Sequence, residues 1–358
     1  MKSSDWPKEI LENFRKGMVI PAQPLALNVN RQLDRCRQKA ITRYYIDAGV
    51  GGIAVGVHST QFEIRDPKIA LFEPVLKLVS ETIDEFSAKK GLKILKISGV
   101  CGKTPQAMEE AGIACRLGYQ ACLLSLAALA KEEVPAMIKH CRSIAGVMPV
   151  IGFYLQPAVG GGVLPYEFWR EFAEIENVVA IKMAPFNRYQ TLDVVRAVCD
   201  AGKENEIVLY TGNDDNIVID LLTEYRFQTS CGEKRVRIRG GLLGHWSVWT
   251  RRAVELLSQI HRITRMNLPI PPEMLVLANQ ITDANAAFFD SAHAFAGCIP
   301  GIHEVLRRQG LMEGLWCLNL HEKLSLGQKE EIDRVYAAYT HLNDDRFVQE
   351  NLAHWMEA

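Results

Sequence analysis

The chain has 358 residues and a formal net charge of -1; 48% of its residues are hydrophobic and 23% are charged. This length and composition suit one large α/β domain with a small appendage. The balanced charge provides no basic surplus, so neither nucleic acid nor an anionic membrane is expected as a partner.

The cellular setting is predicted from the first residues and the cysteines. Residues 1–7 lack the apolar core of a signal peptide, and no apolar stretch is long enough to cross a bilayer. Nine cysteines are scattered without paired spacing, which is typical of reduced, mostly buried thiols. We therefore expect a cytoplasmic protein.

Short apolar runs alternate with amphipathic helical stretches along most of the chain, which predicts parallel strands joined by helical crossovers. Eight such units favour a closed (β/α)₈ TIM barrel over residues 18–262, with an open, doubly wound sheet as the alternative. Residues 1–17 are predicted to form an N-terminal helical extension, and residues 263–358 a C-terminal helical domain. The expected strands are 18–21, 52–57, 93–98, 121–125, 149–154, 178–183, 207–211 and 239–243.

Lys182 stands alone in the apolar run Val178-Val179-Ala180-Ile181-Lys182-Met183-Ala184, which predicts a strand buried on both faces. Burial of an ammonium is costly and lowers the pKa of a lysine. A neutral amine can attack a carbonyl and form a Schiff base. The alternative is a strand-end lysine whose head reaches solvent.

Tyr154 ends the fifth expected strand, one strand before Lys182. Its hydroxyl is a candidate proton shuttle for the amine. The alternative is a tyrosine whose ring packs in the core and whose hydroxyl only forms a structural hydrogen bond. Further polar or glycine-rich positions follow other strands, at the barrel end where active sites lie. We expect these residues to bind substrate, although helix caps and loop packing would explain several of them: His58, Ser59, Thr60, Asn213, Asp214, Gly240, Gly241 and His245.

Together these features resemble the dihydrodipicolinate synthase / N-acetylneuraminate lyase family. The most specific elements are Tyr154 and Lys182, 28 positions apart, and the phrase Val179-Ala180-Ile181-Lys182. The resemblance implies a class I lyase or aldolase that forms a Schiff base with a 2-oxo acid such as pyruvate. It also implies an aldehyde as the second substrate, no cofactor, and a homo-oligomer, most simply a tetramer.

Three departures from the family pattern concern the substrate. The loop after the second strand usually reads G-[TS]-T-G-E, and here it reads Gly56-Val57-His58-Ser59-Thr60. Val159 stands where synthases place the arginine that holds the second substrate's carboxylate. The aromatic pair expected after the fourth strand is also missing. A genuine dihydrodipicolinate synthase is therefore not expected.

The main hypothesis is a Schiff-base lyase or aldolase acting through Lys182, with a dehydratase as a close variant. A barrel that has lost catalysis and binds a small ligand is the first alternative. A metal-dependent aldolase is the second, although the nine histidines show no metal-ligand spacing and no metal site is predicted.

Overall fold

The structure is a computed structural model and describes residues 1–357. The chain divides into two compact units, residues 1–18 with 95–242 and residues 19–94 with 243–358. One eight-stranded sheet has the order β1-β10-β7-β6-β5-β4-β3-β2. Its end strands, β1 and β2, join through a parallel bridge between Ala22 and Ala54, so the sheet closes on itself. The chain is the (β/α)₈ barrel with C-terminal helices that the sequence predicts.

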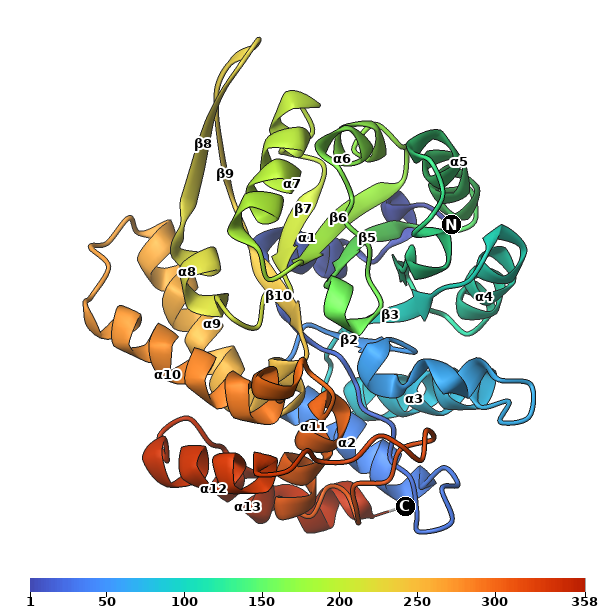
Figure 1. The fold of residues 1–358 in the computed structure, drawn as a ribbon, viewed down its shortest axis with the longest axis vertical. Coiled ribbons are helices and arrows are strands. Elements are labelled where there is room, and N and C mark those ends of the chain that lie inside the picture. The colour runs from blue at the N-terminus through green and yellow to red at the C-terminus, as the bar shows by residue number, and fades with distance from the viewer. Residues whose placement is uncertain (358) are drawn as a thin grey trace. The chain divides into compact units, whose positions relative to one another are not determined.

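The first unit holds parallel strands separated by helices, and the helices lie outside the strands (Figure 1). The residues of β3 to β7 are all buried, which explains why these strands are mostly apolar; the charged exceptions are Lys96 of β3 and Lys182 of β6. The strands are β3 (Leu95–Val100), β4 (Ala121–Leu124), β5 (Val150–Leu155), β6 (Val178–Ala184), β7 (Val208–Thr211) and β10 (Gly240–Leu243). The helices are α4 (Thr104–Arg116), α5 (Val134–Ala145), α6 (Tyr166–Phe172), α7 (Arg188–Asp200) and α8 (Ile217–Leu222).

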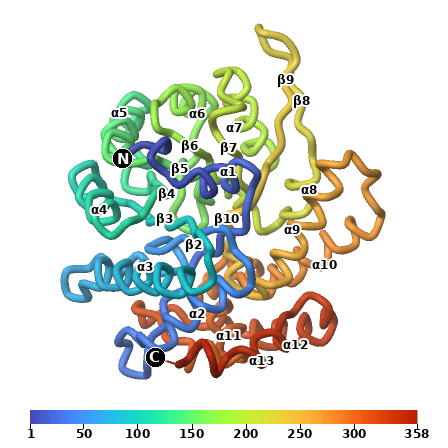
Figure 2. The backbone as a smooth tube through the Cα atoms, turned by 180° about the vertical axis from the view of Figure 1, so that it is seen from behind, coloured from blue at the N-terminus to red at the C-terminus, as the bar shows by residue number. Residues whose placement is uncertain are grey.

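The N-terminal helix α1 (Lys8–Lys16) belongs to the first unit and lies across β5–β7 in Figure 2. Its buried Phe14 stacks on Tyr210 of β7, with 5.1 Å between the ring centroids. The Tyr210 hydroxyl donates to the Phe14 carbonyl at 2.8 Å. The expected N-terminal helix is therefore present, and its apolar face covers this part of the sheet.

A two-stranded hairpin that the sequence analysis did not predict follows α8. It consists of β8 (Glu224–Thr229) and β9 (Gly232–Arg237), and it projects beyond the helices of its unit in Figure 1. Ion pairs hold it, including Lys234 to Glu204 at 2.6 Å and Arg237 to Glu224 at 3.1 Å. It lies outside the eight-stranded sheet.

The second unit contains two strands and a group of helices. Its strands are β1 (Val19–Pro21) and β2 (Gly52–Val55), and its first helices are α2 (Arg35–Ala48) and α3 (Phe72–Ala88). The C-terminal helices are α9 (Thr250–Arg265), α10 (Glu273–Phe288), α11 (Cys298–Arg308), α12 (Gln328–Ala338) and α13 (Asp345–Met356). Tyr44 of α2 donates to the buried carboxylate of Asp344 at 2.7 Å, which ties the start of α13 to α2.

Candidate active site around Lys182

Lys182 lies in β6, and only 8% of the residue is exposed. Its Nζ lies 4.3 Å from the centroid of the Phe153 ring on β5. Phe153 and Lys182 pair across the two parallel strands, so their side chains project from the same face of the sheet. The amine therefore rests on an apolar ring that shields it from water.

Burial lowers the pKa of Lys182 from 10.5 to about 8. The carboxylate of Asp214, just beyond β7, acts in the opposite direction, because a negative charge favours the ammonium. Burial outweighs this attraction. About one Lys182 in ten is then neutral at pH 7, compared with about one in three thousand for an ordinary lysine.

Gly212 provides the space for the lysine stem. A Cβ at this position would lie 2.5 Å from Cε of Lys182 and 2.9 Å from Cβ of Ala184. The Gly212 N–H donates to the carbonyl of Met183 at 2.6 Å, which holds the turn against β6. The side chain of Lys182 thus passes directly over the backbone of Gly212, and a larger residue would displace the amine.

Asn213, a predicted substrate-binding residue, is fully buried, and its amide is engaged within the protein. Its Oδ1 accepts from the N–H of Phe186 at 3.1 Å. Its Nδ2 donates to Asp220 at 2.9 Å and to Thr191 at 3.3 Å. These bonds hold the turn that carries Gly212 and Asp214. Asn213 therefore supports the turn, Asp214 acts on the amine through its charge, and substrate binding by either residue stays a prediction.

Asp220 of α8 joins this support into one network. The carboxylate is fully buried and accepts from Thr211 at 2.7 Å and from Asn216 at 2.9 Å. It also forms an ion pair with Arg188 of α7. One buried carboxylate thus connects β7, α7 and α8 beneath the Lys182 site, as expected for a buried charge that persists only when it is paired.

Tyr154 does not meet Lys182 in the way that the sequence suggested. Its hydroxyl donates to the carbonyl of Leu164 and accepts from the N–H of the same residue, each at 3.2 Å. Its ring packs against Trp169 of α6, with 5.3 Å between the ring centroids. Burial raises the pKa of Tyr154, so the hydroxyl holds its proton more firmly than usual.

A bulge explains why Phe153, and not Tyr154, faces the amine. Val150 pairs with Val178, an offset of 28 residues, but the register then shifts and Ile151 pairs with Ala180. Beyond the shift the offset is 29, so Tyr154 is opposite Met183. A one-residue change of register moves a side chain to the other face of the sheet. Tyr154 accordingly lies on the helix side.

The 56–60 loop belongs to the second unit, where residues 58–60 form a single 3₁₀ turn. The hydroxyls of Ser59 and Thr60 donate to the carbonyls of Ala22 and Gln23, each at 2.7 Å. The Gly56 N–H in turn donates to Thr60 Oγ1 at 3.0 Å. Both hydroxyl protons are thus used within the unit, and a role of His58, Ser59 and Thr60 in binding substrate stays a prediction.

Gly240 and Gly241 lie in β10 and pair with Tyr210 and Thr211 of β7. A Cβ at Gly240 would lie 2.6 Å from both N and O of Met18, so the glycine permits close approach of a neighbouring segment. The Gly241 N–H donates to the Met18 carbonyl at 3.3 Å. These contacts account for the glycines through packing. Substrate binding at either residue stays a prediction.

His245 lies in the second unit and is buried between aromatic rings. Its ring stacks on Phe288 and meets Trp249 edge-on, at centroid separations of 6.3 and 6.4 Å. Burial lowers its pKa to about 4, and Asn285 opposes this shift by hydrogen bonding. The imidazole is therefore neutral at pH 7. Its proposed contact with substrate also stays a prediction.

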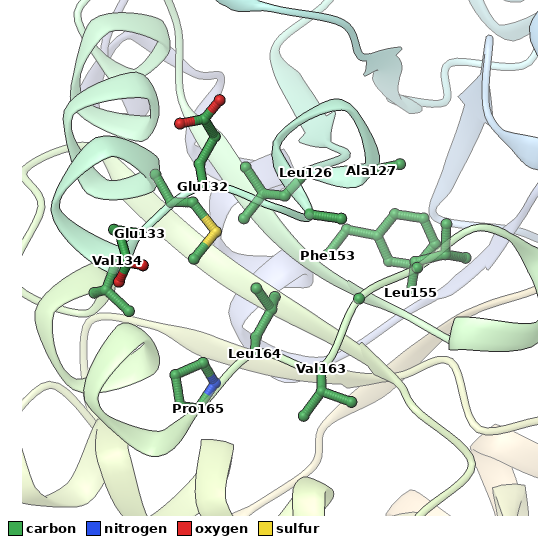
Figure 3. A pocket seen from close by; sticks show the side chains of 14 residues that line it. Leu126, Ala127, Glu132, Glu133, Val134, Phe153, Leu155, Val163, Leu164 and Pro165 are labelled. Atoms are coloured by element: carbon green, nitrogen blue, oxygen red, sulfur yellow. The ribbon is translucent and has the colours of Figure 1, made fainter.

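A pocket of about 220 Å³ adjoins Phe153 in the first unit (Figure 3). Phe153 and Leu155 lie at one end, Glu133 and Val134 lie at the other, and Leu126 and Leu164 face each other across it. The remaining lining residues are Ala127, Ala130, Glu132, Met137, Gly161, Gly162, Val163 and Pro165. The ring that supports the Lys182 amine is thus also a wall of this pocket.

Comparison with known proteins gives the family of this chain. A profile of the Dihydrodipicolinate synthetase family matches residues 16–223. The chain belongs to this family. No curated protein sequence matches it significantly.

Solved structures similar to this family member include a dihydrodipicolinate synthase at 17% identity and TM-score 0.70, with 90% of this chain and 99% of that chain covered. The N-acetylneuraminate lyase from Mycoplasma synoviae has 15% identity and TM-score 0.67, with 92% and 99% covered. The dihydrodipicolinate synthase from Acinetobacter baumannii, solved with pyruvate, has 16% identity and TM-score 0.70, with 90% and 98% covered. At these identities the likeness shows the fold.

Members of the Dihydrodipicolinate synthetase family are class I lyases and aldolases that act through a Schiff base. Within residues 1–357, no group of three or more His, Cys, Asp or Glu side chains is arranged to hold a metal ion. Across the same residues, no helix is long and apolar enough to span a membrane.

Sequence reasoning missed Phe153, Gly212 and Asp220 in this family member. Phe153 immediately precedes Tyr154. Because successive side chains of a strand point to opposite faces, only one of the two can face Lys182, and the sequence does not show which. A glycine in a polar turn after a strand, as Gly212 is, gives no sign in the sequence that a lysine side chain passes over it. Asp220 falls within the apolar sequence Ile217–Leu222, where a single acid signals a buried, paired carboxylate.

Proposed function

We propose that this chain is a class I lyase or aldolase in which Lys182 forms a Schiff base with a 2-oxo acid. The observation that carries the proposal is the buried amine of Lys182, whose pKa is lowered to about 8 and whose Nζ rests on Phe153. Membership of a family of Schiff-base enzymes supports it independently.

In the proposed reaction, the neutral amine attacks the 2-oxo carbon and forms a carbinolamine. Loss of water gives an iminium, which accepts the electron pair left when a proton leaves C3. The resulting enamine attacks an aldehyde carbon, a C–C bond forms, and the aldehyde oxygen takes a proton. Water then hydrolyses the iminium and releases a 4-hydroxy-2-oxo acid. Cleavage follows the same steps in reverse, and a dehydratase would use the same imine.

The chain's own residues favour this chemistry in two ways. Burial supplies neutral amine for the attack, and the Asp214 carboxylate stabilises positive charge on the nitrogen after the imine forms. We assign Tyr154 the positioning of the loop that contains Leu164, because its hydroxyl bonds that residue twice. Proton transfer by Tyr154 stays a prediction from the family pattern.

The direct test is to mix the protein with pyruvate, reduce with borohydride and map the adduct by mass spectrometry. We expect one adduct, on Lys182, and none in Lys182→Ala. Lys96→Met is the matched control, because Lys96 is a second buried lysine on a barrel strand, 5% exposed. This variant should keep the adduct. Turnover that is abolished by EDTA without any adduct would indicate a metal-dependent aldolase, and binding without an adduct would indicate a ligand-binding barrel.

The second substrate is proposed to lack a carboxylate at the position served by Val159, because no cation stands there. Assays that combine pyruvate with aspartate semialdehyde, and separately with neutral aldehydes and aldoses, test this point. Efficient formation of dihydrodipicolinate would contradict it and identify the chain as a synthase.

A further inference from the structure

We infer that the pocket beside Phe153 binds an apolar portion of the substrate, so that this protein acts on 2-oxo acids or aldol products that carry an alkyl or aryl group. The inference rests on the proposed function of Lys182. It adds a substrate class, which neither the family nor the fold specifies.

Phe153 lies between the amine and the pocket. Its ring centroid is 4.3 Å from Nζ of Lys182, and Phe153 lines the pocket although Lys182 does not, so a bound carbon chain would enter the pocket past the edge of this ring. A 2-oxo acid bound to Nζ through its second carbon would extend the rest of its carbon chain from a point close to this ring. Leu155 and Leu164 then continue the wall beyond Phe153 (Figure 3).

The pocket is lined mainly by apolar side chains, and the described residues that line it include no cation. Of the fourteen lining residues, all within the part of the chain that the structure describes, ten carry hydrocarbon or thioether side chains, two are glycines and two are glutamates. None carries a positive charge. Glu132 and Glu133 would repel a second carboxylate, and no cation is present in the lining to pair with one. The lining side chains thus supply apolar walls and no partner for a second carboxylate, while backbone atoms and the two glutamates leave polar surface in the pocket.

The pocket is large enough for a substituent of about six carbons. A cavity of about 150 Å³ lined by aliphatic and aromatic side chains is large enough to bind benzene. The present pocket, at about 220 Å³, has space for a group of comparable or somewhat larger size. An alkyl chain of about six carbons or a phenyl ring therefore fits, whereas the methyl group of pyruvate would leave most of the pocket to water.

Hydrogen bonds hold part of the pocket wall in place. Leu164 is bonded through both its N–H and its carbonyl to the Tyr154 hydroxyl. The Gly161 N–H donates to the carbonyl of Gln156 at 3.0 Å, which closes the turn before this wall.

The test compares the concentrations of 2-oxo acids that give half-maximal borohydride-trapped adduct on Lys182. The series is pyruvate, 2-oxobutanoate, 2-oxohexanoate and 2-oxooctanoate, with 2-oxoadipate as the charged counterpart of 2-oxohexanoate. Each methylene that becomes buried should lower the half-saturating concentration up to about fourfold. 2-Oxoadipate should require at least about tenfold more than 2-oxohexanoate.

Ala130→Phe fills the pocket from an exposed position, and Ala136→Phe is the matched control, since Ala136 is exposed on α5 and does not line the pocket. The gain from pyruvate to 2-oxooctanoate should disappear in Ala130→Phe and persist in Ala136→Phe, with circular dichroism confirming that both fold. Adducts that form with equal ease along the series, or best with 2-oxoadipate, would overturn this inference alone. Absence of an adduct with every acid would overturn the proposed function, and the inference with it.

Discussion

The buried amine of Lys182 predicts a measurable dependence of stability on pH. Its pKa falls from 10.5 in an ordinary lysine to about 8 in the folded chain, and the main cause is burial. Because one pKa unit corresponds to about 1.36 kcal/mol, this difference in pKa corresponds to about 3 kcal/mol in the free energy of unfolding. Below pH 8 the amine is charged in both states, so the folded protein carries the full cost of burying the charge.

The sign of the effect follows from proton counting. Between pH 8 and pH 10.5 the unfolded chain still binds the proton and the folded chain has lost it. The free energy of unfolding therefore rises with pH across this window. Lys182→Met removes the titrating group, and taking the difference between wild type and variant cancels the titration of every other residue to first order.

The assay is urea unfolding of both proteins at intervals from pH 7 to pH 10.5. We expect the free energy of unfolding of the wild type, relative to Lys182→Met, to increase by about 3 kcal/mol over the window. Parallel curves for the two proteins would refute the argument, because the amine would then titrate equally in the folded and unfolded states.

Imine formation gives an independent measure of the same pKa. Its rate with pyruvate depends on the fraction of neutral amine, which at pH 7 is about 300-fold larger for a pKa of 8 than for one of 10.5. The rate should rise about tenfold per pH unit below pH 7.5 and level off above pH 8.5. The rate is measured at each pH by quenching samples into borohydride at successive times. A rate profile with its midpoint near pH 10.5 would contradict the lowered pKa of this amine.

The remaining predictions concern the supports of the site and the assembly. Gly212→Ala should slow adduct formation about tenfold or more, since overpacking of this kind costs about 1–3 kcal/mol, and Gly112→Ala, where a Cβ meets only the end of a flexible arginine, is the control. Tyr154→Phe should raise the half-saturating concentration of 2-oxooctanoate about tenfold by releasing Leu164. A fall of two to four orders of magnitude in the maximal rate with pyruvate would instead support proton transfer by Tyr154. Asp220→Asn should lower the free energy of unfolding in urea by about 1–3 kcal/mol, because an amide NH₂ replaces one fully buried oxygen that accepts hydrogen bonds, and Arg188 loses the nearer of its two carboxylate partners; an unchanged value would remove Asp220 from the buried network. Sedimentation should show an oligomer at micromolar concentration, as the family resemblance implies, and a monomer would contradict this.

The fold was predictable because buried parallel strands leave a simple signal. Every expected barrel strand coincides with an observed one to within a few residues, since most are short apolar runs between helices; the third, 93–98, also carries Lys93, Lys96 and Ser98. The hairpin of β8 and β9 was missed because its strands are partly exposed and charged, and its alternation Glu224-Tyr225-Arg226-Phe227 is too short to be distinguished from a polar loop.

The site was less predictable, because register is not visible in an apolar strand. Lys182 could be found, since a single charge in a buried run is conspicuous. The bulge between β5 and β6 could not be predicted. Val178 and Val179 are both buried and apolar, so the sequence shows no alternation of polar and apolar residues that would identify the extra residue. The pairing of Lys182 with Phe153 therefore required the structure.

Phe153 lies beside the Lys182 amine where the sequence suggested Tyr154, and this difference changes the electrostatic surroundings of the amine. A hydroxyl could have replaced part of the hydration that the ammonium loses on burial, and would have limited the fall in pKa. The face of a phenyl ring attracts a desolvated cation by about 2 kcal/mol or somewhat more, which is less than the cost of removing an unpaired ammonium from water. Burial therefore prevails, and the pKa of Lys182 is lowered despite Phe153 and Asp214. The same ring favours an apolar substituent on the bound acid, so a single feature of the β5–β6 register accounts for both the neutral amine and the proposed preference for apolar substrates.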